Sequence, residues 1–282
     1  MAISMRTRTW WRTTRLAAGA GVAARVLAAS LGTAGASSHD SPFSPGGGGV
    51  NGIATSPFED VTPPTFNDSP SLVPAQRWLD VALAHRTRRL DALARSVSGA
   101  KTLPGNVSAG LAKLVAVDSV GIGALAGDVS SATNVAALDQ IAASMIDDYR
   151  VYAVVAPVVR TTLASYDQLA AVASLQALEP AIGAAMATDS KSSSADRAAA
   201  LYRDLLAQLT DVTAADTAEA SAVLALGPAS FPSSSAVLSA ASSTLAASAA
   251  RLSSARQDVK GIVALLAAPG LARVRVRLDA HA

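Results

Sequence analysis

The chain has 282 residues, of which 50% are hydrophobic but only 4% aromatic, and it contains no cysteine. Because Ala, Val and Leu dominate the apolar residues, the composition favours helices over a β-sandwich, whose faces need β-branched and aromatic side chains. The lack of cysteine excludes disulfides, thiolate metal sites and a cysteine nucleophile. His85 is the one histidine away from the chain ends, so neither a histidine-rich metal site nor a serine–histidine–aspartate triad is expected.

Residues 1–36 have the pattern of a signal peptide. The first 38 residues contain five arginines and no acidic residue, and a basic start precedes the apolar run 16–31. Small residues at Ala34 and Ala36 match the two positions that signal peptidase recognises, which predicts cleavage after Ala36. Arg25 interrupts the apolar run, so an organellar transit peptide and an uncleaved anchor remain as alternatives. We therefore expect secretion or location in the cell envelope.

The segments that flank the helical domain 74–268 lack its periodicity. Residues 37–73 are rich in Ser, Pro and Gly and predict a disordered stem, and residues 269–282 form a basic tail. Outside the leader no run reaches the roughly 18 to 20 consecutive apolar residues of a membrane span, so none is expected after signal removal. Without the leader arginines the chain is net acidic, which argues against nucleic-acid binding.

Apolar residues at alternating spacings of three and four predict an all-α fold, an elongated antiparallel helical bundle of about five long helices beginning with a helical hairpin. The spacing is that of a coiled coil, which leaves room for a homo-oligomer. A kink or short break is expected at Pro157, and Glu179-Pro180 marks either a second kink or the start of a short helix at 181–187. The long helices are predicted at 71–98, 108–130, 133–178, 195–226 and 233–268. The buried face of the fourth is predicted to hold Leu201, Leu205, Val212 and Ala222.

The first two helices each carry one charge among their apolar positions, Arg86 and Asp118. Facing residues of an antiparallel hairpin have a nearly constant index sum, and pairing Leu93 with Leu111 also places Arg86 opposite Asp118. Such a register pair adds little net stability but penalises slipped alignments. The alternative is that both side chains extend outward to solvent and never meet.

Residues 148–157 read Asp-Tyr-Arg-Val-Tyr-Ala-Val-Val-Ala-Pro. In this segment the chain resembles a group of uncharacterised secreted proteins of high-GC Gram-positive bacteria, which carry Asp-Tyr-Arg-Val-Tyr before a proline. The resemblance covers about residues 77–167 and implies a secreted, all-helical protein with no activity to carry over. The second helix departs from this pattern in Gly121, Gly123 and Gly127, where stronger helix formers are expected.

The same segment holds the best candidate site. Asp147 and Asp148 are neighbours on a helix, so their carboxylates point about 100° apart and do not converge for acid–base chemistry. The favoured interpretation is structural, with Tyr149 and Tyr152 packed inward and Arg150 paired with an acid. A surface for a partner or ligand is the second interpretation, made of Asp148, Tyr149, Arg150, Tyr152 and Tyr166. A basic face is also predicted on the first helix, made of Arg86, Arg88, Arg89 and Arg95.

The sequence thus predicts an exported, non-catalytic helical protein that acts by surface contact with a protein or polymer of the cell envelope or medium. No catalytic residue, cofactor or metal ligand is expected. The alternative is a carrier or sensor that encloses an apolar ligand near Pro157, with Tyr149, Tyr152 and Tyr166 lining the pocket. A hydrolase is third, because no nucleophile–base pair stands out.

Overall fold

The computed structural model describes residues 64–66, 71–188 and 193–266. The predicted signal peptide, most of the predicted stem and the basic tail lie outside these residues. All regular structure in the described ranges is helical, so the all-α prediction is confirmed. The elements are α1 (Leu72–Gly99), α2 (Gly105–Ser131), α3 (Val135–Asp147), the π-helical turn η2 (Val151–Val155), α4 (Ala156–Gln176), α5 (Glu179–Thr188), α6 (Ser193–Leu224), the 3₁₀ turn η3 (Pro228–Ser230) and α7 (Ser234–Leu265).

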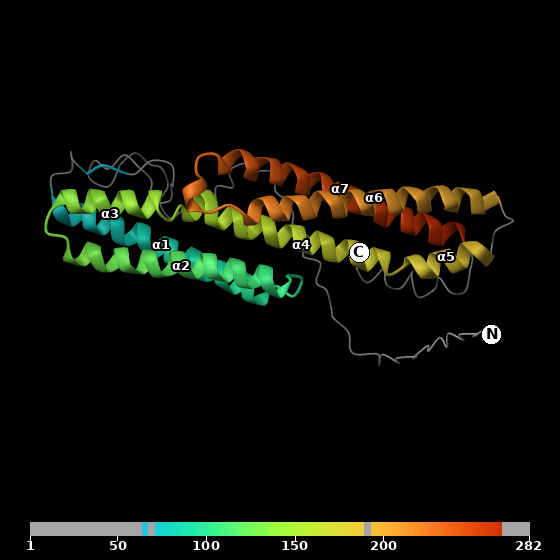
Figure 1. Cartoon of the computed structure of the whole chain (residues 1–282), viewed down its shortest axis with the longest axis horizontal. Coiled ribbons are helices and arrows are strands. Elements are labelled where there is room, and N and C mark those ends of the chain that lie inside the picture. Colours follow the sequence, from blue (N-terminus) through green and yellow to red (C-terminus); the bar gives the residue numbers. More distant parts are fainter. Residues whose placement is uncertain (1–63, 67–70, 189–192, 267–282) are drawn as a thin grey trace, which may run out of the picture.

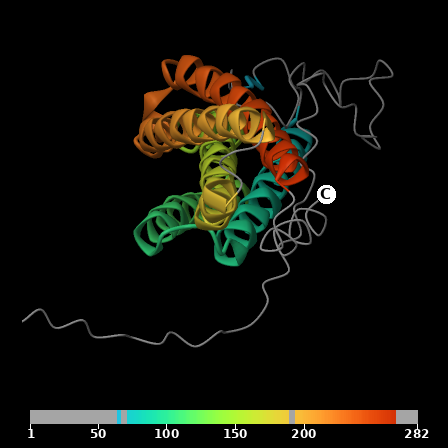
Figure 2. The same cartoon turned by 90° about the vertical axis from the view of Figure 1, so that its right-hand side faces the viewer.

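The described helices form an elongated body (Figure 1). The stretch from α3 through η2 and α4 to α5 runs along its length, with α1 and α2 side by side near one end and α6 and α7 near the other. Seen end on, the two helix pairs lie on opposite sides of α4 (Figure 2). Helix pairs joined by short connections bury their apolar faces as antiparallel neighbours, which explains both pairs.

Two hydrophobic cores follow from this arrangement. The first is built by α1, α2, α3, η2 and the start of α4, and the second by the end of α4 with α5, α6 and α7. Val223 of α6 and Ala241 of α7 belong to the first core, so the second helix pair reaches across to it. The boundary between the two cores falls inside α4, between Tyr166 and Ala171, and the α6–α7 loop packs on the first core through Phe231.

The predicted apolar faces of α1 and α2 are buried. The predicted four–three positions of α1 are at most 3% exposed: Leu79, Leu83, Arg86, Leu90, Leu93 and Val97. Those of α2 are Leu111, Val115, Asp118, Ile122, Leu125 and Val129, of which Leu125 alone remains partly exposed. Helix α3 begins close to its predicted start. The Asn134 side chain caps it by accepting a hydrogen bond from the Ala137 amide at 2.9 Å. The helix boundaries were thus set locally by caps and breakers, and the faces by periodicity.

Two predictions on the later helices need correction. Ala222 is exposed, while Ala220 and Val223 are buried. Asp216 lies on the buried face of α6. Because Asp216 is charged, it interrupts the apolar pattern, and the four–three spacing of the buried positions cannot be seen from the apolar residues alone. The break in the third predicted helix precedes Pro157, because α3 ends at Asp147 and Pro157 takes the second position of α4, where the first turn needs no amide donor.

By length and composition alone, α2 and the stretch Val135–Thr188 are apolar enough to cross a membrane. The prediction from the sequence rested on uninterrupted apolar runs and therefore did not include either stretch, because Gly, Ser and single charges interrupt both. Both stretches also include residues of the two cores, as the core helices of a folded domain do.

Candidate functional site

The segment from Asp147 to Tyr152 lies in the first core, where the loop between α6 and α7 packs on it. It begins at the last residue of α3 and ends inside η2. Arg150 has φ 37° and ψ 49°, the left-handed region that side chains other than glycine rarely adopt. The backbone thus turns sharply between α3 and η2, and this turn directs successive side chains toward different helices.

Arg150 connects the end of α3 to the loop between α6 and α7. Its Nη2 lies 2.7 Å from Asp147 Oδ1, and its guanidinium carbon lies 4.0 Å from the centroid of the Phe231 ring, directly after η3. The side chain is only 12% exposed, so the ion pair and the cation–π contact are both shielded from water on the arginine side. The expected pairing of Arg150 with an acid is confirmed.

The two tyrosines of the segment reach the first helix pair. The Tyr149 ring packs against Gly121 of α2 so closely that a Cβ atom at Gly121 would overlap it. The Tyr152 ring faces the guanidinium carbon of Arg86 on α1 at 5.1 Å. Together with Arg150, these side chains join α1, α2, α3 and the α6–α7 loop, and we call residues 147–152 the junction segment.

The predicted interaction surface is not a single exposed patch. Asp148 is exposed, whereas Tyr149, Arg150, Tyr152 and Tyr166 are half-buried. Tyr149 and Tyr166 pack against the first core. These contacts favour a structural role over acid–base catalysis, because the Asp147 carboxylate already forms an ion pair with Arg150. Within the described residues no three His, Cys, Asp or Glu side chains come together as a metal site would need.

Arg86 and Asp118 are both inside the protein, at 0% and 2% exposure. Arg86 donates from Nη1 to the Ala82 carbonyl at 3.3 Å. The outward alternative for the two side chains is therefore wrong, and Arg86 does not belong to the predicted basic face. Arg88 and Arg95 are exposed. Burial, together with the charges of Arg88 and Arg86, lowers the pKa of the neighbouring His85.

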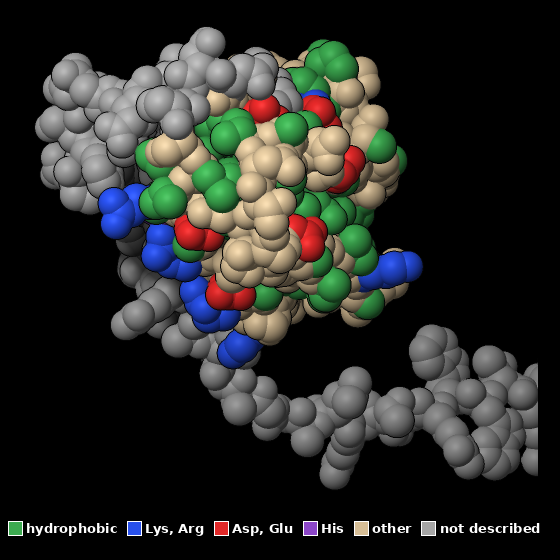
Figure 3. Space-filling model, turned by 90° about the vertical axis from the view of Figure 1, so that its left-hand side faces the viewer, with side chains coloured by type: hydrophobic (Ala, Val, Ile, Leu, Met, Phe, Trp, Pro, Cys, Tyr) green, Lys and Arg blue, Asp and Glu red, His purple; other side chains and the backbone are tan. Residues whose placement is uncertain are grey.

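Charged side chains of both signs occur at one end of the molecule. Figure 3 looks onto the end of the molecule where α1 and α3 begin and α2 ends. Lys and Arg side chains gather along one edge there, while apolar, acidic and uncharged side chains cover the centre. This end therefore carries apolar, acidic and basic side chains together, and its basic side chains are confined to one edge.

Sequence reasoning missed Asp216, the buried acid of the second core. Asp216 is 0% exposed on α6, and neither of its carboxylate oxygens has a hydrogen-bond partner in the described part of the chain. Burial raises the pKa of Asp216, the nearby Ser248 hydroxyl of α7 opposes the shift, and Glu219 adds to it. The position of Asp216 on the four–three spacing of α6 is the signal that would have found it.

Asp216→Asn is expected to raise the free energy of unfolding at pH 7. Because the folded pKa lies above the unfolded value of about 3.9, the carboxyl group disfavours folding once it is ionised. Its penalty is absent below the unfolded pKa and grows as the pH rises through the folded pKa, so the benefit of Asn should fade toward pH 4. Urea denaturation over a pH series measures this. Asp211→Asn, exposed on the same helix, should stay within about 0.5 kcal/mol of the parent, and a loss of stability for Asp216→Asn at every pH would contradict the interpretation.

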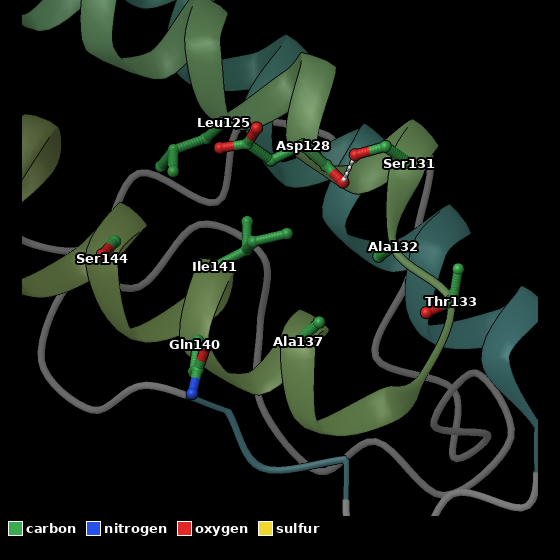
Figure 4. Close-up of a pocket in the computed structure, with 9 residues that line it drawn as sticks. All are labelled: Leu125, Asp128, Ser131, Ala132, Thr133, Ala137, Gln140, Ile141 and Ser144. Atoms are coloured by element: carbon green, nitrogen blue, oxygen red, sulfur yellow. Dashed lines mark hydrogen bonds between the residues drawn. The ribbon is translucent and has the colours of Figure 1, made fainter.

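The structure also shows a hollow of about 380 Å³ between the end of α2 and the start of α3 (Figure 4). Leu125, Asp128 and Ser131 line it from α2, and Ala137, Gln140, Ile141 and Ser144 from α3. The Ser131 hydroxyl donates to the backbone carbonyl of Asp128, one turn earlier on α2. The hollow is open and shallow, and its lining does not include Pro157 or the tyrosines.

Comparison with known proteins gave no matching family, no matching curated protein and no matching solved structure.

Proposed function

We propose that the protein is exported and works without catalysis, as an elongated helical body that contacts a protein or polymer of the cell envelope or medium through its surface. The contacts that the junction segment makes support this proposal. Its two tyrosines and Arg150 contact other parts of the same chain, and Asp147 pairs with Arg150. The surface available to a partner is then the outer faces of the long helices.

The segment around Pro157 is closely packed, which does not favour the carrier alternative. Val154, Val155, Ala156, Val158 and Val159 are at most 1% exposed and belong to the first core. An apolar ligand would have to displace these side chains, and each displaced contact costs stability. The hollow of Figure 4 lies at the other end of α3.

Cell fractionation with N-terminal sequencing tests the export. The protein is recovered separately from medium, wall, membrane and cytosol, and a mature start at or near Ser37 outside the membrane is expected. The control is a chain from which residues 2–36 are deleted, which should stay in the cytosol with its Met1 or the next residue at the start. An intact Met1 of the full chain in the membrane or cytosol would contradict the proposal and make the leader an anchor or a different signal.

A further inference from the structure

The outer face of α2 carries apolar side chains that no described helix covers. Ala116, Val117, Val120, Gly123, Ala124 and Gly127 recur at spacings of three and four, and all are exposed. Val117 is 57% and Val120 74% exposed, two of the four large exposed hydrophobic side chains in the described ranges. Between residues 114 and 127 the one charged residue is Asp118, which is buried on the opposite side. We call these six residues the α2 face.

The position of α2 in the fold leaves this face free of the other described helices. Helix α2 packs mainly on α1, touches α3 and η2 lightly, and lies at the margin of the molecule (Figure 2). Only 22% of its most apolar window is buried. A surface helix usually has a polar outer side, so an exposed stripe of this kind marks a contact surface.

We propose that the α2 face binds a second copy of this chain, with the two α2 helices antiparallel about a two-fold axis at Val120. Residues equally distant from Val120 then face each other. Val117 meets Gly123 of the partner subunit, and Ala116 meets Ala124 of the partner subunit. Val117 thus opposes a small residue, Ala116 opposes another alanine, and Val120 meets its own copy at the axis, so the helices can approach closely in a self-complementary interface.

The charges at the two ends of the face select the antiparallel orientation. Lys113 precedes the α2 face and Asp128 follows it, and both are exposed. In the antiparallel pair Lys113 lies beside Asp128 of the partner subunit, and the contact occurs twice. A parallel pair would set each charge beside its like, which disfavours association. A membrane is a poorer occupant, since Lys113 lies on the same side of α2 as Val117 and Val120, where it would enter the apolar layer.

Val120→Asp tests the interface, and the test does not depend on export. We expect the parent to sediment as a dimer at micromolar concentrations, and Val120→Asp to weaken the dimer about 100-fold or more, because two carboxylates meet at the axis. The fold should be unaffected, since Val120 is exposed, and far-UV circular dichroism checks this. Val73→Asp is the matched control, at a 69% exposed position on α1 away from the α2 face, and should leave the dimer intact.

A charge reversal gives a second readout. Lys113→Glu should weaken the dimer, and adding Asp128→Lys should restore it. A parent that is monomeric over the whole concentration range, or a dimer that Val120→Asp leaves unchanged, would overturn the proposal. So would a monomer that binds phospholipid vesicles through Val120, since the occupant would then be a membrane.

Discussion

Replacing Asp118 with Leu while keeping Arg86 is expected to lower the free energy of unfolding by about 3–5 kcal/mol. Both side chains are buried, on the two helices α1 and α2 that pack on each other, and the predicted register sets them opposite one another. The substitution leaves the Arg86 guanidinium inside the protein without this opposite charge. The Tyr152 ring and the Ala82 carbonyl interact with the guanidinium but carry no net charge to balance it.

The double variant Arg86→Met with Asp118→Leu should regain most or all of the loss, because replacing a buried charge pair with apolar residues of similar size is often neutral or stabilising. Urea denaturation of the parent, both single variants and the double variant gives the coupling energy. Arg88→Met, an exposed position on α1, should change stability by less than about 0.5 kcal/mol. Additive effects of the two single substitutions would show that the charges do not interact.

Two glycines on α2, Gly121 and Gly123, should respond to alanine in opposite directions. A Cβ at Gly123 meets no atom of its own chain within 4 Å, so Gly123→Ala should stabilise the monomer by about 0.5–1 kcal/mol through helix propensity. A Cβ at Gly121 would overlap the Tyr149 ring. Gly121→Ala must displace that ring, and overpacking of this kind costs about 1–3 kcal/mol, so a net loss of up to about 2 kcal/mol is expected.

Thermal and urea unfolding of both glycine variants measure the difference. In a Tyr149→Ala background the ring is gone, and Gly121→Ala should then stabilise as Gly123→Ala does. If Gly121→Ala is stabilising while Tyr149 is present, the ring does not pack on α2 as the structure has it.

Helix positions and buried faces followed from the sequence because both depend on local information. Caps and breakers such as Asn134 and Pro104 set the ends of helices, and the four–three spacing set their faces. The same spacing put Arg86 and Asp118 inside, since both occupy apolar positions of their helices. Asp216 obeys the rule as well, since it follows the buried Val212 by four residues on α6.

The junction could not be predicted from the sequence because its contacts join distant segments. Gly121 stood out as a poor helix former, but its reason is the ring of Tyr149, which no local pattern reveals. Phe231 gave no signal at all, and it contacts Arg150 from the far end of α6. The helix breaks before Pro157, because the backbone of Arg150 adopts a left-handed conformation. The Arg150 side chain contacts Asp147 and Phe231 in this conformation.

The most direct test of the junction segment compares unfolding of the two cores in Phe231→Ala. Trp78 of α1 reports on the first core by fluorescence once Trp10 and Trp11 are replaced with Phe, and far-UV ellipticity reports on all helices. We expect the two denaturation curves to coincide in the parent and to separate in Phe231→Ala, because the ring that Arg150 contacts is lost. Curves that still coincide in Phe231→Ala, with an unchanged midpoint, would contradict the conclusion that these residues couple the two halves of the protein.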